Sequence, residues 1–260
     1  MWLFEFISIV LSFSAVIRGH VIRSTENGLT ENPETNPNLF EGDIMLENFR
    51  SAVAQTGRWP NNTFNYDYLE GNYAGLSKYE QDFIDKTLVE LFDMINKDGP
   101  CMKLRKIRPE DHVYRKDFNR FTKSNGCYSG VGFMPIMQQF TSIGQGCLHR
   151  GTIMHEVMHR IGLWHEQSRQ DRDEYITIHW ENIAQGGESQ FRLQTWNYDD
   201  LNTPYDYGSL MHYGWNFFSK NGKATMTSKK PGVTLGQRNG PTYWDIKKIR
   251  ILYGCDPRPQ

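Results

Sequence analysis

The stretch HEVMHRIGLWHE, residues 155–166, contains three histidines and a glycine at the spacing of a metal site. His155 and His159 are four residues apart, so on a helix they lie on one face and can bind the same ion. Gly162 comes three residues later, and glycine readily adopts the left-handed conformation that ends a helix. The chain can then turn and return His165 to the same ion.

Three nitrogen ligands with an open fourth position are typical of a catalytic zinc ion rather than a structural one. Glu156 directly follows the first histidine and can act as general base on a water at the metal. The alternative is an amphipathic helix with two ordinary surface histidines, but the added Gly162 and His165 make such a coincidence rare. The stretch therefore predicts one catalytic Zn2+ ion per chain.

The rest of the composition indicates a globular chain that carries a targeting segment. At 260 residues it can form one large domain or two small lobes with extensions. Its formal net charge is −1, so no basic field favours nucleic acid as a partner.

Residues 6–17 form an apolar run at the extreme N-terminus that is too short to span a bilayer comfortably. The run predicts a secretory signal peptide over residues 1–19, although Glu5 stands where a positive charge is usual. The alternative is an N-terminal membrane anchor. No later segment is long and apolar enough to cross a membrane, so we expect a secreted, extracellular protein without membrane association after signal removal.

Four cysteines follow the predicted signal peptide, and an even number in a secreted chain indicates two disulfides. Three pairings are possible, and local proximity favours Cys127–Cys147, which leaves Cys101–Cys255. Free buried cysteines are the alternative, which the secretory context disfavours. The sequon that begins at Asn61 could carry a glycan.

Apolar spacing and capping residues predict two helices besides the histidine helix. The first runs from about Lys78 to Ile95, with a capping box formed by Ser77 and Glu80. The last begins near Thr242, with Asp245 three residues on. Both helices place apolar side chains on one face, which we expect to pack inward.

The histidine helix is expected to begin near Gly151, with Thr152 as its N-cap, and to end at Gly162. Short strands are expected over residues 112–118 and 133–140. Residues 181–240 are rich in Gly, Asn, Asp and aromatic residues and predict an irregular lobe. Together these segments indicate an α+β fold whose two lobes form a cleft at the zinc.

The extended motif, with Glu166 after its third histidine, resembles the astacins, a branch of the metzincin zinc endopeptidases. The resemblance covers roughly residues 51–255. It implies a metzincin-like two-lobed catalytic domain, with a twisted sheet and helices in the N-terminal lobe and an irregular C-terminal lobe that ends in a helix. The cysteine positions also fit the two-disulfide pattern of that family, as does Trp59 near the start of the mature domain.

A second match, SLMHY at residues 209–213, is similar to the methionine turn of the astacins. The resemblance implies that Met211 lies beneath the zinc ligands and that Tyr213 is a fifth, removable ligand. A phenol beside the metal can swing away and donate its proton to a developing oxyanion. The alternative for both residues is simple core packing.

Two further expectations concern activation. The tetrapeptide FEGD, residues 40–43, resembles the latency motif of astacin propeptides, in which Asp43 would bind the zinc of the zymogen. Cleavage near Arg50 would release it, so we expect a propeptide over residues 20–50 and a catalytic domain over residues 51–260. In this family Glu166 would then receive the new N-terminal ammonium through water; a solvated glutamate is the alternative.

Arg238 falls where several members of that family place a basic residue in the S1′ pocket. A guanidinium there can pair with a carboxylate, which suggests acidic side chains just after the scissile bond; a surface arginine is the alternative. The resemblance implies an endopeptidase whose partners are protein or peptide substrates and an activating protease. We expect a monomer, although no sequence feature decides the oligomeric state. A zinc-bearing adhesion or toxin module, or another class of metal-dependent hydrolase, is the competing interpretation.

Overall fold

The computed structural model describes residues 32–45, 57–69, 75–108, 111, 116–135, 138–195 and 199–260. These residues belong to one compact unit that spans residues 31–260. The predicted signal peptide and the expected cleavage point at Arg50 lie outside the described residues. Within the described ranges, no helix has both the length and the apolar composition needed to span a bilayer.

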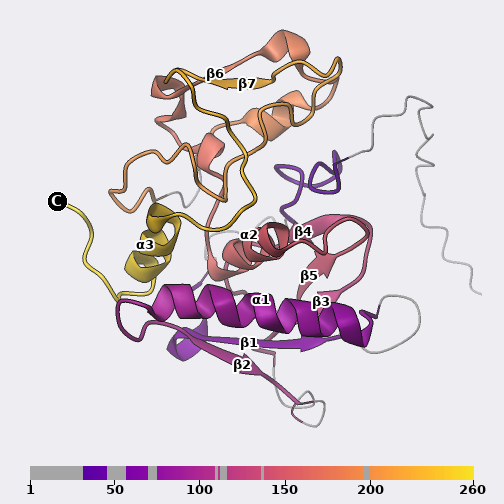
Figure 1. The fold of residues 1–260 in the computed structure, drawn as a ribbon, viewed down its shortest axis with the longest axis vertical. Helices are drawn as coiled ribbons and strands as arrows, with labels where there is room; N and C mark the ends of the chain where they lie inside the picture. Colours follow the sequence, from indigo (N-terminus) through magenta and orange to yellow (C-terminus); the bar gives the residue numbers. More distant parts are fainter. Residues whose placement is uncertain are drawn as a thin grey trace, which may run out of the picture. The chain divides into compact units, whose positions relative to one another are not determined.

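A five-stranded sheet forms the N-terminal half of the unit (Figure 1). The strands follow the order β2-β1-β3-β5-β4, and all neighbours are parallel except β4, which runs antiparallel to β5. In β1 an aromatic residue stands at every second position, so three rings share the face that packs into the core. The strands are β1 (Thr63–Tyr68), β2 (Lys103–Lys106), β3 (Asn119–Thr122), β4 (Cys127–Ser129) and β5 (Gln139–Ile143).

Helix α1 (Lys78–Asn96) confirms the first predicted helix. The hydroxyl of Ser77 accepts from the backbone N–H of Glu80, and the Glu80 carboxylate accepts from the N–H of Ser77, which completes the capping box. The apolar face of α1 is buried against β2 and the neighbouring helices. The fully buried residues of this face are Ile84, Leu88, Leu91 and Ile95.

Helix α2 (Arg150–Ile161) carries the first two histidines and lies beside α1, over β4 and β5 (Figure 1). Its N-cap is His149, whose ring Nδ1 accepts from the N–H of Gly151 at 3.2 Å, so the expectation that Thr152 caps the helix is wrong. His149 comes earlier in the chain and its ring already accepts the capping hydrogen bond, so Thr152 lies inside the first turn of the helix. Gly162 ends the helix with φ of 128°, as expected.

The two predicted strands are misplaced. Residues 116–118 are not a strand, β3 begins only at Asn119, and residues 112–115 lie outside the described residues. The second prediction, over 133–140, overlaps only the start of β5. Phe133 instead makes a single bridge to Gly57, and its ring packs at a tilt against that of Trp59. Its apolar character therefore reflects the packing of a loop against the core.

The C-terminal half contains little regular structure, as the sequence predicts. Strands β6 (Ile176–Ile178) and β7 (Met226–Ser228) pair antiparallel, and a second apolar cluster packs around them. Helix α3 (Tyr243–Leu252) begins after Thr242, which forms a capping box with Asp245. Two disulfides, Cys101–Cys255 and Cys127–Cys147, have the pairing favoured by local proximity. The fold is α+β, and short 3-10 helices lie at Pro60–Asn62, Glu166–Ser168, Arg172–Glu174, Trp180–Asn182 and Glu188–Phe191.

Candidate metal centre

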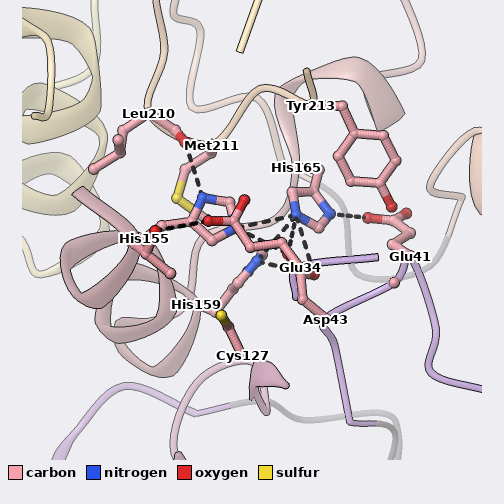
Figure 2. Close-up of polar contacts among 12 residues, drawn as sticks. Glu34, Glu41, Asp43, Cys127, His155, His159, His165, Leu210, Met211 and Tyr213 are labelled. Atoms are coloured by element: carbon pink, nitrogen blue, oxygen red, sulfur yellow. Dashed lines mark hydrogen bonds and ion pairs between the residues drawn. The ribbon is translucent and has the colours of Figure 1, made fainter. Parts of the chain in front are cut away.

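The three histidines of the motif converge on one buried point (Figure 2). The Nε2 atom of His165 lies 3.1 Å from that of His159 and 3.3 Å from that of His155. None of the three side chains is exposed to solvent. The turn after Gly162 therefore returns His165 to the first two histidines, as the spacing predicts.

Backbone carbonyls orient the two helical histidines. The Nδ1–H of His155 donates to the carbonyl of Leu210, and the Nδ1–H of His159 donates to that of Leu163, each at 2.8 Å. A carbonyl oxygen only accepts hydrogen bonds, so the proton resides on Nδ1 and the lone pair of Nε2 faces the centre. Burial, followed by the charge of Arg238, lowers the pKa of His155 to about 4, which keeps this ring neutral.

The third histidine is oriented by a carboxylate. The Nδ1 atom of His165 lies 2.7 Å from Oε2 of Glu41. Burial opposes a charge on this ring, but Asp43 and Glu41 outweigh burial and raise the pKa of His165 to about 9. A cation bound at this point would replace the proton, because imidazole binds metals in its unprotonated form.

Asp43 completes the cluster as a fourth potential ligand. Its carboxylate lies 3.1 Å from Nε2 of His155, 3.2 Å from that of His165 and 3.6 Å from that of His159. Burial alone would raise the pKa of this carboxyl, but the neighbouring histidines hold the pKa well below its usual range. Carboxylate oxygen and imidazole nitrogen are both normal zinc ligands.

The segment that carries Asp43 is bound along strand β4, which lies at an edge of the sheet. The N–H of Met45 donates to the carbonyl of Ser129 at 2.8 Å, and the N–H of Ser129 donates to the carbonyl of Asp43 at 2.9 Å. Gly42 has φ of 72°, and a Cβ there would lie 2.7 Å from a ring atom of Phe218. The hydrogen bonds to Ser129 and the tight packing at Gly42 therefore fix the backbone that holds Asp43 beside the histidines.

Glu156 and Tyr213 lie beside the histidines, and both are fully buried. Neither the carboxylate oxygens of Glu156 nor the hydroxyl of Tyr213 has a hydrogen-bond partner among the described residues. Burial, then the charge of Asp43, raises the pKa of both groups well above the usual values. A divalent cation at the histidines would oppose this rise for Glu156.

The donor set fits a zinc ion. Three imidazoles with their Nε2 lone pairs turned inward, one carboxylate and a nearby phenol are the ligand types that zinc accepts. The orphaned oxygens of Glu156 and Tyr213 are costly to bury unless a further group or water occupies the space between them and the histidines. Within the described ranges, this is the cluster of histidines and acids able to hold a metal ion.

The turn that contains Met211 contacts the histidines through the residues on either side of Met211. Met211 is 1 % exposed, and the ring of Tyr213 lies 4.7 Å from that of His165, centroid to centroid. The carboxylate of Asp245, from the start of α3, accepts from the hydroxyl of Ser209 at 2.6 Å and from the N–H of Leu210 at 2.7 Å. Helix α3 thus positions the carbonyl that orients His155.

Glu166 is buried but already has partners. Its carboxylate pairs with the ammonium of Lys248 and accepts from the N–H of Asp206 at 2.8 Å. A recess of about 510 Å³ lies beside it, lined in part by Gly57 and Arg58. Residues 46–56 lie outside the described residues, so a contact between Glu166 and a new N-terminus stays a prediction.

Arg238 is not a surface arginine. Its Nη2 donates to Oε2 of Glu34 at 2.7 Å, and its Nε donates to the same oxygen at 3.0 Å (Figure 2 shows Glu34 beside the histidines). Its Nη1 donates to the carbonyls of Leu210 and His212. Arg238 therefore binds a carboxylate next to the metal centre and is bonded to the same carbonyl as His155.

Sequence reasoning missed several members of the site. Glu34 lies in a polar segment that showed no periodicity, and Glu41 was noted only as part of a tetrapeptide. The sequence places Asp245 three residues into the last helix, and its contacts with Ser209 and Leu210 add a role that this position did not indicate. Each missed role depends on a partner more than 30 residues away.

The exposed position of Asn61 is compatible with a glycan.

Comparisons with known proteins agree with this geometry. The sequence model of the Astacin peptidase family matches residues 52–254. The chain is 38 % identical to zinc metalloproteinase nas-15 of Caenorhabditis elegans over 234 residues, which cover 83 % of the chain and 39 % of nas-15. It is 35 % identical to nas-13 of the same organism over 247 residues, which cover 91 % of the chain and 55 % of nas-13. The chain thus spans about half or less of the length of these two relatives.

A solved structure is also similar. High choriolytic enzyme 1, a hatching enzyme zinc-protease from the medaka fish Oryzias latipes, matches with a TM-score of 0.64 and 34 % sequence identity. The match covers 82 % of this chain and all of that one.

Proposed function

Because this chain belongs to the astacin family of peptidases, we propose that it is a zinc-dependent endopeptidase, which hydrolyses internal peptide bonds of proteins and is made as a secreted zymogen. The observation that carries the proposal is the convergence of three inward-facing Nε2 atoms beside the unpaired carboxylate of Glu156. His155, His159 and His165 are the proposed zinc ligands.

The proposed reaction divides the work between the metal and the chain. A zinc ion held by the three histidines would acidify a water and polarise the substrate carbonyl. Glu156 takes a proton from the attacking water and delivers it to the leaving amine. Tyr213, whose raised pKa keeps the phenol protonated, donates a hydrogen bond to the carbonyl oxygen as negative charge develops.

The segment 32–45 accounts for latency. Asp43 occupies the space that the attacking water needs, and the pairing of this segment with β4 covers the sheet edge. Cleavage near Arg50 by another protease would release the segment. The recess beside Glu166 and Lys248 is the proposed site for the processed N-terminus, whose ammonium would contact Glu166 through water.

The contacts of Arg238 support a preference for Asp or Glu just after the scissile bond. Two disulfides and the predicted signal peptide support an extracellular location. We propose protein or peptide substrates, an activating protease as the second partner, and a monomeric enzyme.

The test is casein cleavage by the processed protein, with and without a zinc chelator. Cleavage should stop on chelation and return on zinc addition. Glu156→Ala should retain one zinc per chain, measured by metal analysis, yet lose activity roughly a thousandfold. Glu181→Ala, at an exposed glutamate, serves as the matched control and should behave as wild type. Full turnover by zinc-loaded Glu156→Ala would contradict the proposed mechanism.

A further inference from the structure

The carboxylate of Glu34 is bound by two side chains, Arg238 and Thr152, and not by one ion pair alone. We call this carboxylate-binding site the receptor. Glu34 is 5 % exposed, and its Oε2 accepts from both Nε and Nη2 of Arg238. Its Oε1 accepts from the hydroxyl of Thr152 at 2.8 Å, and Nε of Arg238 lies 3.3 Å from the same oxygen. Each oxygen of the carboxylate therefore has at least one dedicated donor.

Thr152 behaves differently from another buried threonine in a helix. The hydroxyl of Thr87, in α1, donates to the carbonyl of Phe83 one turn earlier, which is the usual local choice for helical threonine. The hydroxyl of Thr152 instead donates to Glu34, which is 118 residues away in sequence. Both residues are similarly buried, at 4 % and 6 % exposure. Burial alone therefore does not explain where the hydroxyl of Thr152 points.

The backbone prepares Arg238 for this role. Its Nη1 is bonded to the carbonyls of Leu210, His212 and Gln237, which leaves the edge formed by Nε and Nη2 to face the ligand. Gly151 lets this loop approach α2, because a Cβ on Gly151 would lie 1.8 Å from the carbonyl oxygen of Arg238. The close contact brings the guanidinium to the first turn of α2, where Thr152 lies.

The receptor lies next to the reacting groups. Thr152 is one helical turn before Glu156, which we propose as the proton donor to the leaving amine. The residue that supplies this amine is the one just after the scissile bond, so we expect its side chain to be the part of the substrate that can reach Thr152 and Arg238. When segment 32–45 leaves, the donors of Thr152 and Arg238 lose their carboxylate partner.

We infer that Thr152 is a specificity-determining residue, which together with Arg238 binds the carboxylate of an acidic side chain just after the scissile bond. Glu34 is the zymogen's own occupant of this receptor. The inference rests on the proposed peptidase function and deepens it, because it assigns the acidic preference to two side chains from different elements. A hydroxyl and a guanidinium that both donate hydrogen bonds to one carboxylate favour Glu over its neutral isostere Gln, because the amide of Gln offers them fewer acceptors.

The experiment compares two peptides that differ only in Glu or Gln after the scissile bond, cleaved by the processed enzyme. Wild type should favour the Glu peptide in kcat/KM. Thr152→Val, which keeps the shape but removes the hydroxyl, should lower the Glu-to-Gln ratio roughly tenfold, mainly through KM. Thr152→Ser should restore the ratio, and Thr87→Val, the matched control in α1, should leave it unchanged.

Each other outcome has a defined meaning. If wild type cleaves both peptides equally, or if Thr152→Val slows both by the same factor, the inference is overturned and the peptidase proposal stands. If wild type cleaves neither peptide nor casein, the peptidase proposal itself fails. Should Thr152→Val fold poorly, judged by its melting temperature, Thr152→Ala provides a second removal of the hydroxyl, and an unchanged ratio there overturns the inference equally.

Discussion

Helix α2 and the turn at residues 209–213 both line the metal centre, but different forces hold them in place. In α2 the four-residue spacing of His155 and His159 places both rings on one face, whatever the rest of the chain does. The turn belongs to no helix or strand. Its geometry depends on Asp245 and Arg238, which reach it from 26 to 36 residues away. One half of the site is therefore local and the other half is built by distant contacts.

The histidines of the two regions also have different partners. His159 directs Nε2 to the metal centre, whereas His212 bonds to the hydroxyl of Tyr205 through Nε2 and contacts the carbonyl of Tyr213 through Nδ1. Burial lowers the pKa of His212 to about 4, so it is a neutral structural residue. Two buried histidines in one site thus have unrelated roles.

The largest expected effect comes from His159→Ala. It removes one of three proposed ligands, so zinc stoichiometry should fall towards zero and casein cleavage should fall by roughly a thousandfold or more. Metal analysis and activity of the processed protein measure both. His212→Asn is the matched control and should retain one zinc per chain. Loss of zinc from His212→Asn, with zinc kept in His159→Ala, would reverse the assignment.

A smaller effect is expected where the turn is held from a distance. Asp245→Ala leaves the buried donors of Ser209 and Leu210 without their acceptor, which should lower the free energy of unfolding by about 3 kcal/mol. Because the carbonyl of Leu210 orients His155, zinc affinity should also fall roughly tenfold. Denaturant unfolding and competitive metal titration measure the two quantities.

Asp173→Ala removes an acid that is largely exposed and should change the free energy of unfolding by less than about 0.5 kcal/mol. If Asp245→Ala destabilises the protein no more than this control, the turn does not depend on α3. The contrast between a local and a long-range half of the site would then be wrong.

The smallest effect concerns the end of α2. Gly162→Ala places a Cβ at φ of 128° and 2.9 Å from a methyl of Leu252, which should cost about 2 kcal/mol of folding free energy. Gly99→Ala is the control, because Gly99 also has positive φ but no neighbour within 4 Å of the new Cβ. The difference in melting temperature between the two variants separates the clash from the backbone strain. An equal fall in melting temperature for both variants would show that the side chain of Leu252 moves aside without lowering the stability.

Prediction from sequence succeeded where the signal was local. The capping box at Ser77, the start of the last helix after Thr242 and the helix end at Gly162 all involve residues within four positions of each other. It failed for the strands, because β3 and β5 are defined by pairing with each other, and their paired residues lie 20 positions apart in sequence. The cap of α2 was misassigned because two nearby polar residues, His149 and Thr152, could each supply an acceptor.

The sequence by itself determined the metal-binding face of α2, the α+β class and the presence of two disulfides, because spacing and residue chemistry carry that information along the chain. Tertiary structure alone decided that Glu41 orients His165, that Asp245 positions the turn, and that Thr152 and Arg238 share one carboxylate. These contacts join segments up to 204 residues apart, so they exist only once the core has packed and brought the segments together.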